Sequence, residues 1–391
     1  MSTELQIETT EQNIPIFNLT IHGIDDEGNL FKLLSLLFPK HQTQFIIVKV
    51  LNKGHSNKLI KINYNQPPYS FNESSSSLLV RIYGDLTSSL IDRTNEMKCM
   101  RIIRNFDCFQ QLYAVFNNGF VYSYYDGCDI SFEKLSDVKY SRLIAEKVAQ
   151  LHCLPTDEFN EIQNGDLLEV NNMEPKLFST LLKWIDRLKD EFISSSRNLT
   201  RYEFLFPSKS YVLNEVNKLM DHYLPSPISN IVICHNDLNA ANVILAPDEN
   251  SVHFIDMEYC DINYAAYDIA NHFCEFTGPH AVDTERYPSL KFQKNWLKIY
   301  LTAYYKYSQS KLDPKYNDQQ INVLTEDYLN LWLKEINCFA LVSHLLWAVW
   351  AVIYASENLD SMNFLAYADA RMKQYYDMKN WLLSAFRLPV L

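Results

Sequence analysis

The chain has 391 residues, 47% of them hydrophobic, and its 35 basic and 47 acidic side chains leave a formal charge of −12. With 25 Tyr and 22 Phe but only 8 Gly, it is too rich in aromatic residues for a disordered chain and too poor in glycine for a collagenous one. The length suits two lobes with separate cores, and the acidic balance argues against a protein that binds nucleic acid over a broad surface.

The first half of the chain is expected to be mostly strand. Short runs rich in β-branched and apolar side chains predict strands over residues 45–51, 58–64, 78–83, 113–116 and 120–124. Asn117-Asn118-Gly119 separates the last two runs and predicts a hairpin turn, because Asn and Gly tolerate positive φ. Apolar residues at helical spacing predict a helix near residues 87–104.

From about residue 137 the pattern becomes helical, with helices expected over residues 139–152, 173–194 and 209–222 and beyond residue 290. Three short apolar runs interrupt it, over residues 231–233, 243–246 and 252–255. The longest apolar stretch, Phe339–Ala355, contains Ser343 and His344 and is shorter than a comfortable membrane span. We therefore expect a buried helix there, no membrane span, and two unequal lobes with a cleft between them.

The cysteines and the first residues bear on the compartment. Eight cysteines are scattered without a Cys-x-x-Cys pair, which fits neither a zinc site nor a disulfide framework. Residues 1–13 are polar and acidic, unlike a secretory signal peptide. We therefore expect reduced thiols and a cytoplasmic location.

The interrupting short strands enclose polar residues at a spacing that suits phosphoryl transfer. The chain reads Cys234-His-Asn-Asp-Leu-Asn-Ala-Ala-Asn242, and Ile255-Asp-Met-Glu-Tyr259 follows the next hairpin. Transfer from ATP to a hydroxyl needs a carboxylate that takes the hydroxyl proton, and side-chain oxygens that hold magnesium against the phosphates. Asp237 fits the first role, and Asn242 and Asp256 fit the second.

A single Asp-x-x-x-x-Asn between strands usually makes only a turn. The joint pattern of His235-x-Asp237, Asn242 and a strand ending in Ile255-Asp256 is far more specific and indicates a phosphotransferase. His235 stands two residues before the expected base. We interpret it as a residue that braces the loop by hydrogen bonding rather than one that takes part in the chemistry.

These segments are similar to those of the choline/ethanolamine kinases, within the larger group of protein-kinase-like small-molecule phosphotransferases. The similarity rests on Cys234–Asn242, Phe254–Tyr259, Asn263–Phe276 and His344–Trp350, with Leu79–Gly84 and Asp92-Arg93 upstream. It runs from about residue 45 to about residue 376. It implies an α+β, protein-kinase-like bilobal fold: an N-terminal extension over 1–40, a β-rich ATP-binding lobe over 41–125, and a mainly helical catalytic and amino-alcohol-binding lobe over 126–391.

The resemblance also implies ATP as co-substrate, Mg²⁺ as cofactor and a set of ATP-binding residues. Arg81 stands where the family has the basic residue that contacts the ATP phosphates, and Glu96 resembles its ion-pair partner. Asn52–Lys58 corresponds to the nucleotide loop, whose backbone N–H groups can cradle phosphate oxygens, and Ser123–Tyr125 corresponds to the adenine hinge. The residues expected to bind ATP are therefore Gly54, Ser56, Asn57, Arg81, Glu96, Ser123 and Tyr125.

An aromatic pocket for a cationic alcohol follows from the same resemblance. Trp347 and Trp350 are three residues apart and share a helix face; without the resemblance they would be interpreted as core. Aromatic faces attract an ammonium group. The expected substrate-binding residues are Glu258, Glu275, Trp347, Trp350 and Tyr367, while Asp268 and Asn271 are expected to brace the loop that carries Asp237.

The activity implied is ATP-dependent phosphorylation of the ethanolamine hydroxyl to phosphoethanolamine, the first step of phosphatidylethanolamine synthesis by the CDP-ethanolamine route. Ethanolamine is favoured over choline because Phe276-Thr277-Gly278 and Met362 offer less aromatic cage than choline kinases carry. A choline kinase, or one that accepts both alcohols, is the alternative within the class. An aminoglycoside phosphotransferase would not need the paired tryptophans, and an inactive kinase-like scaffold would usually lack one of the three acidic or amide residues. The expected partner is a small amino alcohol, and the chain is expected to be a monomer or homodimer.

Overall fold

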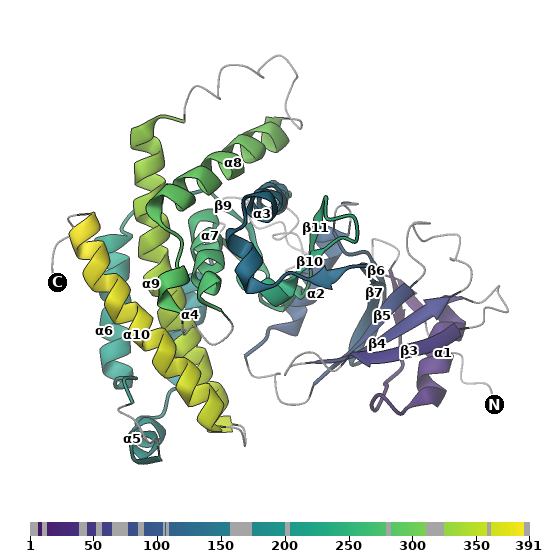
Figure 1. Ribbon diagram of the computed structural model, residues 1–391. Helices are drawn as coiled ribbons and strands as arrows, with labels where there is room; N and C mark the ends of the chain where they lie inside the picture. Colours follow the sequence, from purple (N-terminus) through teal and green to yellow (C-terminus); the bar gives the residue numbers. More distant parts are fainter. Residues whose placement is uncertain are drawn as a thin grey trace, which may run out of the picture. The chain divides into compact units, whose positions relative to one another are not determined.

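The computed structural model describes residues 7–9, 14–38, 45–51, 57–64, 77–84, 90–104, 106, 109–156, 174–199, 204–278, 283–309, 324–357 and 361–386. By its internal contacts the chain divides into two units (Figure 1). The first comprises Met1–Cys128, Ile244–Glu249 and His253–Glu258, and the second comprises Asp129–Val243, Asn250–Val252 and Tyr259–Leu391.

A seven-stranded sheet forms the centre of the first unit. Its order is β1 (Ile7–Thr9), β2 (Pro15–Phe17), β6 (Leu112–Phe116), β7 (Gly119–Ser123), β5 (Ser77–Tyr83), β4 (Asn57–Tyr64) and β3 (Phe45–Leu51). Neighbouring strands are antiparallel except β2 and β6, which are parallel. The five strands predicted from the sequence are confirmed to within one residue at each end.

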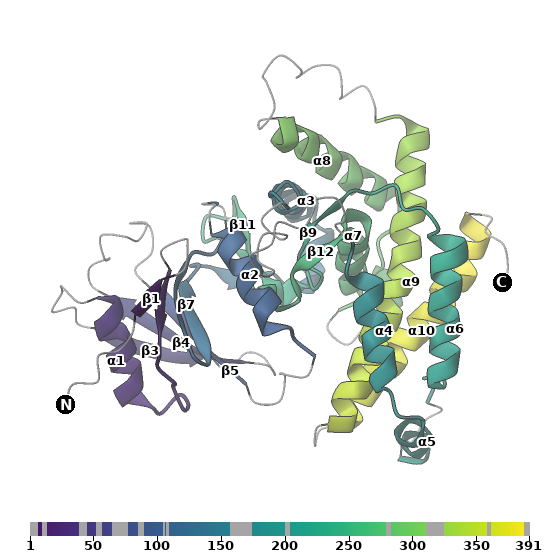
Figure 2. The ribbon, with the colours of Figure 1, turned by 180° about the vertical axis from the view of Figure 1, so that it is seen from behind.

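The N-terminal segment belongs to the core of this unit. Helix α1 (Glu27–Leu37) begins after Asp26, whose side chain accepts a hydrogen bond from the backbone N–H of Asn29. Its leucines Leu30, Leu33 and Leu34 are fully buried in one apolar cluster with residues of β2, β4, β5, β6 and β7, and both views show α1 beside β3 and β4 (Figures 1 and 2). The sequence analysis predicted no element before residue 45. Strands of three residues, such as β1 and β2, leave too few positions for a period to show, but α1 was missed although Leu30, Leu33 and Leu34 stand at helical spacing.

The turn between β6 and β7 lies where it was predicted, but positive φ angles do not form it. Asn117 and Asn118 both have negative φ. Their side chains instead hold the N-terminal segment: Asn118 Nδ2 donates to the Ile21 carbonyl at 2.8 Å and its Oδ1 accepts from Ile21 N at 3.1 Å. Asn117 Nδ2 donates to Asn18 and Thr20 in the same way.

Helix α2 (Arg93–Ile103) follows β5 and is shorter than the predicted helix over 87–104. Asp92 caps it by accepting from the backbone N–H of Asn95, which fixes the start several residues later than the apolar spacing alone indicated.

The second unit is mainly helical. Its helices are α3 (Val138–His152), α4 (Leu177–Arg187), α5 (Asp190–Leu199), α6 (Lys209–Lys218), α7 (Ala265–Cys274), α8 (Leu290–Gln309), α9 (Glu326–Glu357) and α10 (Ser361–Ala385). Helix α3 packs on α8, and α7, α4 and α10 pack on α9; Figure 2 shows α4 and α6 with α9 and α10. The single helix predicted over 173–194 is wrong, since Leu188 is extended and buried between α4 and α5.

Helix α9 is the centre of this packing. Among the residues that the structure describes, it is the one helix long and apolar enough to cross a membrane, but 94% of its most apolar window is buried inside the protein. The interpretation of Phe339–Ala355 as a core helix is therefore confirmed.

The three interrupting strands are also confirmed. β9 (Ile231–Cys234) pairs antiparallel with β12 (Asp261–Tyr264), a strand the sequence did not predict because only Ile262 in it is aliphatic. β10 (Val243–Leu245) lies between β11 (Val252–Phe254) and β8 (Cys128–Asp129). The polar loop of residues 235–242 therefore runs between two buried strands, β9 and β10.

Candidate active site

Asp237 lies in the loop between β9 and β10 and is held there by amide side chains. Asn242 Nδ2 donates to the Asp237 carbonyl at 2.8 Å and to its carboxylate Oδ2 at 3.1 Å. Asn239 Nδ2 donates to Oδ1 at 3.2 Å, and Asn239 Oδ1 accepts from the backbone N–H groups of Ala241 and Asn242. The loop therefore presents an oriented carboxylate. Sequence analysis did not single out Asn239, although its position inside the motif was a signal.

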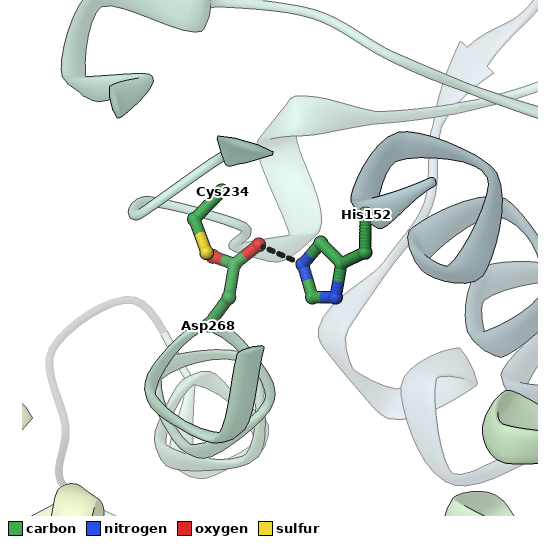
Figure 3. Close-up of side chains that lie close together, drawn as sticks. All are labelled: His152, Cys234 and Asp268. Atoms are coloured by element: carbon green, nitrogen blue, oxygen red, sulfur yellow. Dashed lines mark hydrogen bonds and ion pairs between the residues drawn. The ribbon is translucent and has the colours of Figure 1, made fainter. Parts of the chain in front are cut away.

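The backbone before Asp237 is fixed by Asp268 of α7, which is 1% exposed. Its Oδ2 accepts from the N–H of His235 at 2.9 Å, and its Oδ1 accepts from the N–H of Asn236 at 2.7 Å. His152 of α3 binds Oδ2 through Nε2 at 3.0 Å (Figure 3). Its Nδ1 lies 2.8 Å from the Tyr300 hydroxyl. Burial raises the pKa of Asp268, but the His152 hydrogen bond and charge outweigh it and leave this pKa below its ordinary value.

His152, Cys234 and Asp268 place three possible metal-ligand atoms within 4.8 Å of one another (Figure 3). Both oxygens of Asp268, however, already accept hydrogen bonds. Burial raises the pKa of the Cys234 thiol well above its ordinary value, so the sulfur stays protonated and donates to the Tyr264 carbonyl, whereas metal binding needs a thiolate. We therefore interpret this trio as the brace of the loop rather than a metal centre.

His235 and Asn271 have contacts of different kinds. His235 is fully buried and its Nδ1 accepts from the N–H of Asp237 at 3.3 Å. Asn271, which was expected to brace the same loop, instead holds α9: its Oδ1 accepts from Ser343 Oγ and from Trp347 Nε1, both at 2.8 Å. Asp268 and Asn271 are three residues apart and share a face of α7, yet Asp268 bonds to the loop and Asn271 bonds to α9.

Tyr259 stands at the centre of an aromatic cluster that contains Trp347 and Trp350. The rings of Tyr259 and Trp347 meet edge to face with centroids 5.3 Å apart, and Trp350 Nε1 donates to the Tyr259 hydroxyl at 3.0 Å. Trp184 of α4 meets Tyr259 edge to face, with ring centroids 6.3 Å apart. Sequence analysis missed Trp184, because nothing in the sequence near residue 184 links it to the motif.

A buried arginine joins two other residues expected at the substrate. Arg371 of α10 is 1% exposed; its Nη2 donates to Glu275 Oε1 and its Nε donates to the Tyr367 hydroxyl at 2.9 Å. Burial lowers the pKa of Arg371, but the charge of Glu275 outweighs it and raises that pKa above its ordinary value. Arg371 was missed, although its spacing of four from Tyr367 on one helix was a usable signal.

Two of the residues used to favour ethanolamine over choline, Phe276 and Thr277, are buried in the core. Phe276 is 2% exposed and packs edge to face against Phe273 and Phe292 in the core, while Thr277 Oγ1 donates to the Cys274 carbonyl. The side chain of Met362 lies outside the described residues. That Phe276-Thr277-Gly278 and Met362 offer less aromatic cage than choline kinases carry stays a prediction.

In the first unit, Arg81 of β5 connects three carboxylates. Its neighbours Val80 and Ile82 belong to the apolar core, so the alternation of the strand directs Arg81 to the other face. Nη1 lies 3.0 Å from both Glu96 Oε1 and Asp256 Oδ1, and Nη2 lies 2.7 Å from Glu258 Oε2. Burial lowers the pKa of Arg81, but these charges raise it well above its ordinary value.

A second arginine completes this ionic cluster. Arg93 Nη1 lies 2.8 Å from Glu96 Oε2, and Arg93 Nη2 donates to Asn57 Oδ1 at 3.1 Å. Glu258 Oε2 accepts from Asn57 Nδ2 at 3.0 Å. Burial and the charge of Asp256 raise the pKa of Glu258 to about 7. In this unit Glu258 is thus a member of the cluster around Arg81.

Asp256 and the two predicted hinge residues, Ser123 and Tyr125, also belong to the first unit. Asp256 has φ of +63° and a side chain that is 37% exposed. Ser123 Oγ accepts from the N–H of Gln111, and the ring of Tyr125 stacks on His253 at 4.0 Å. The predicted ATP-binding residues Gly54 and Ser56 lie outside the described residues.

A sheet unit with a buried arginine–carboxylate cluster, and a helical unit with an oriented Asp–Asn loop, define a phosphotransferase of the protein-kinase-like class. A solved choline kinase from Cryptosporidium parvum Iowa II has the same fold, with a TM-score of 0.68, 22% identity, and coverage of 93% of this chain and 98% of that one. The solved Plasmodium vivax ethanolamine kinase gives a TM-score of 0.64 at 22% identity, over 90% of this chain and 89% of that one.

The family described as choline/ethanolamine kinase matches residues 48–376. The chain belongs to the choline/ethanolamine kinase family. It is 32% identical over 383 residues to "Ethanolamine kinase 1" of Homo sapiens, covering 97% of this chain and 78% of that protein. It is 31% identical over 382 residues to "Ethanolamine kinase 1" of Mus musculus, covering 97% of both. The family resemblance drawn from the motifs is therefore confirmed.

Proposed function

We propose that this chain is an ethanolamine kinase, which transfers the γ-phosphoryl group of ATP to the hydroxyl of ethanolamine. The observation that carries the proposal is the similarity to ethanolamine kinases at about 30% identity over nearly the whole chain. The product, phosphoethanolamine, would enter phosphatidylethanolamine synthesis by the CDP-ethanolamine route. The enzyme would act in the cytoplasm on a small amino alcohol, as a monomer or homodimer.

Asp237 is the proposed catalytic base. The hydroxyl oxygen of ethanolamine bonds to the γ-phosphorus, the bond from that phosphorus to the β–γ bridging oxygen breaks, ADP leaves, and the hydroxyl proton passes to the Asp237 carboxylate. The contacts from Asn239 and Asn242 to this carboxylate support the role, since a base is effective only when it is held within reach of the proton. Asp268 and His235 keep the backbone of the loop in place.

ATP is proposed to bind the lobe over residues 41–125, with Arg81 and Glu96, the loop residues Gly54, Ser56 and Asn57, and the hinge residues Ser123 and Tyr125. Asn242 and Asp256 are the proposed Mg²⁺ ligands, and their chemistry fits. Asn242 uses its amide nitrogen toward Asp237, which leaves its oxygen, and among the described residues Asp256 pairs through Oδ1 alone. Such hard oxygen donors suit Mg²⁺, which neutralises phosphate charge when bound.

The ammonium group is proposed to bind in the helical lobe over residues 126–391. Trp347, Trp350 and Tyr367 offer aromatic faces, and a cation gains about 0.5–2 kcal/mol from each such contact. Glu275 is 9% exposed, and among the described residues only its Oε1 accepts a hydrogen bond, from Arg371. Its second oxygen can accept a hydrogen bond from a primary ammonium, whereas a trimethylammonium has no N–H to donate. Glu258 is also among the residues that the sequence predicts to bind the substrate; its contacts with Arg81 and Asn57 support a role beside the phosphates instead.

The test is a substrate panel on the purified protein with Mg²⁺ and ATP, in which ADP release is measured with ethanolamine, its mono- and dimethyl derivatives, choline and kanamycin. We expect kcat/KM to be highest for ethanolamine and to fall with each added methyl group. A higher kcat/KM for choline would make the chain a choline kinase instead, and equal values would make it a dual kinase. Failure to release ADP with any alcohol would support the inactive scaffold.

A further inference from the structure

Asn236, the residue between His235 and the proposed base, has an unusual backbone conformation. Its φ is +64°, in the left-handed region that a β-carbon disfavours and that Asn tolerates better than most residues. Its backbone N–H donates to Asp268 Oδ1 at 2.7 Å. The residue therefore turns the chain immediately before Asp237, and a residue that resists this φ would move the carboxylate that follows.

The side chain of Asn236 is engaged at both ends. Its Nδ2 donates to the Tyr259 carbonyl at 2.9 Å, and its Oδ1 accepts from Asn263 Nδ2 at 2.9 Å. The bond from Asn263 fixes which end of the amide faces Tyr259. Since Tyr259 is the centre of the aromatic cluster with Trp347 and Trp350, one side chain links the catalytic loop to that cluster.

Ethanolamine carries its ammonium and its hydroxyl on adjacent carbons, so its two ends are a short and nearly fixed distance apart. A site that holds the ammonium on aromatic rings and activates the hydroxyl with Asp237 must keep that separation constant. We propose that Asn236 is the positioning residue that sets it, by its left-handed turn before Asp237 and by its tether to Tyr259. This inference rests on the proposed function.

Two substitutions separate the turn from the tether. Asn236→Gly keeps the left-handed conformation accessible but removes both side-chain hydrogen bonds, whereas Asn236→Ala removes the bonds and also disfavours the conformation. Glu249→Gly is the matched control, because Glu249 also has a positive φ, +55°, but lies in the turn between β10 and β11.

Loss of the tether is expected to raise KM for the amino alcohol about three- to tenfold in both Asn236 variants, the range for one lost hydrogen bond. KM for ATP should stay within about twofold of wild type, since the tether does not touch the ATP-binding residues proposed above. Asn236→Ala should in addition lower kcat about tenfold below Asn236→Gly, because the strained turn displaces the base. Glu249→Gly should leave all three constants unchanged.

Intrinsic tryptophan fluorescence adds a readout that does not need turnover. Titration of the amino alcohol should give a weaker binding curve in Asn236→Gly than in wild type, with the thermal midpoint of the two proteins recorded alongside. Equal KM values and equal binding in Asn236→Gly and wild type would refute the role of the hydrogen bond from Asn236 to Tyr259. Equal kcat in the Gly and Ala variants would refute the role of the left-handed conformation. If the wild type prefers another amino alcohol, the proposed function fails, but the same ratios measured with that alcohol still decide the role of Asn236.

Discussion

The buried pair of Arg371 and Glu275 gives a test whose magnitude follows from the structure. Replacing Arg371 with Met keeps most of the apolar stem and removes the guanidinium that donates to Glu275 and Tyr367. The carboxylate of Glu275, 9% exposed, would lose its cation in largely dry surroundings, and breaking such a pair from one side costs about 3–5 kcal/mol. Arg371 Nη1 is buried without a hydrogen-bond partner in the described part of the chain. Removing this unsatisfied donor stabilises the folded state by about 1 kcal/mol. We expect a net loss of about 2–4 kcal/mol.

Urea unfolding at neutral pH, followed by tryptophan fluorescence, measures this loss. Combining Arg371→Met with Glu275→Gln removes both charges, so the double variant should be more stable than the sum of the two single losses predicts, by about 2 kcal/mol. The control is Arg142→Met, which breaks the exposed pair of Arg142 with Glu146 and should change stability by less than about 0.5 kcal/mol. If Arg371→Met matches this control, or if the two single losses simply add, the pair of Arg371 and Glu275 does not stabilise the fold by this amount.

Three further predictions concern the base, the aromatic cluster and a buried histidine. Asp237→Ala should abolish phosphorylation while the far-UV circular dichroism spectrum and thermal midpoint stay near those of wild type; retained turnover would remove the assignment of the base. Trp350→Ala should raise KM for the amino alcohol much more than KM for ATP, whereas an equal rise in both would make Trp350 a packing residue. Burial lowers the pKa of His272 from 6.5 to about 4, and its Nδ1 donates to the Leu238 carbonyl. Because the unfolded chain then binds the extra proton, stability should fall by about 3 kcal/mol as the pH drops from 6.5 to 4, and His272→Asn should lack this part of the pH dependence.

Local patterns predicted the parts of this protein that depend on neighbours in sequence. Five of the seven strands of the sheet, the core helix at Phe339–Ala355, and the polar loop with Asp237 and Asn242 all follow from periodicity or from spacing within one segment. The hairpin turn was placed correctly but explained wrongly, because the asparagines of that turn are used for contacts with Ile21 and Thr20 rather than for positive φ.

Contacts between residues far apart in the chain were not predicted from the sequence. Trp184 meets Tyr259, and Arg371 meets Glu275, across 75 and 96 positions. Asn271 bonds to Trp347 rather than to the loop. Each of these outcomes is decided by how the helices pack on α9, which no single segment encodes.

The way β2 and α1 join the sheet has a practical consequence for how this protein is prepared. The family match begins at residue 48, so a shortened gene designed from it would discard Pro15–Phe17 and Glu27–Leu37. The truncated chain would expose an unpaired backbone edge along β6 and an apolar sheet surface formed by Ile60, Val80 and Ala114. Such surfaces promote self-association. An insoluble truncated product would therefore report the loss of this N-terminal cover and would say nothing about the kinase fold itself.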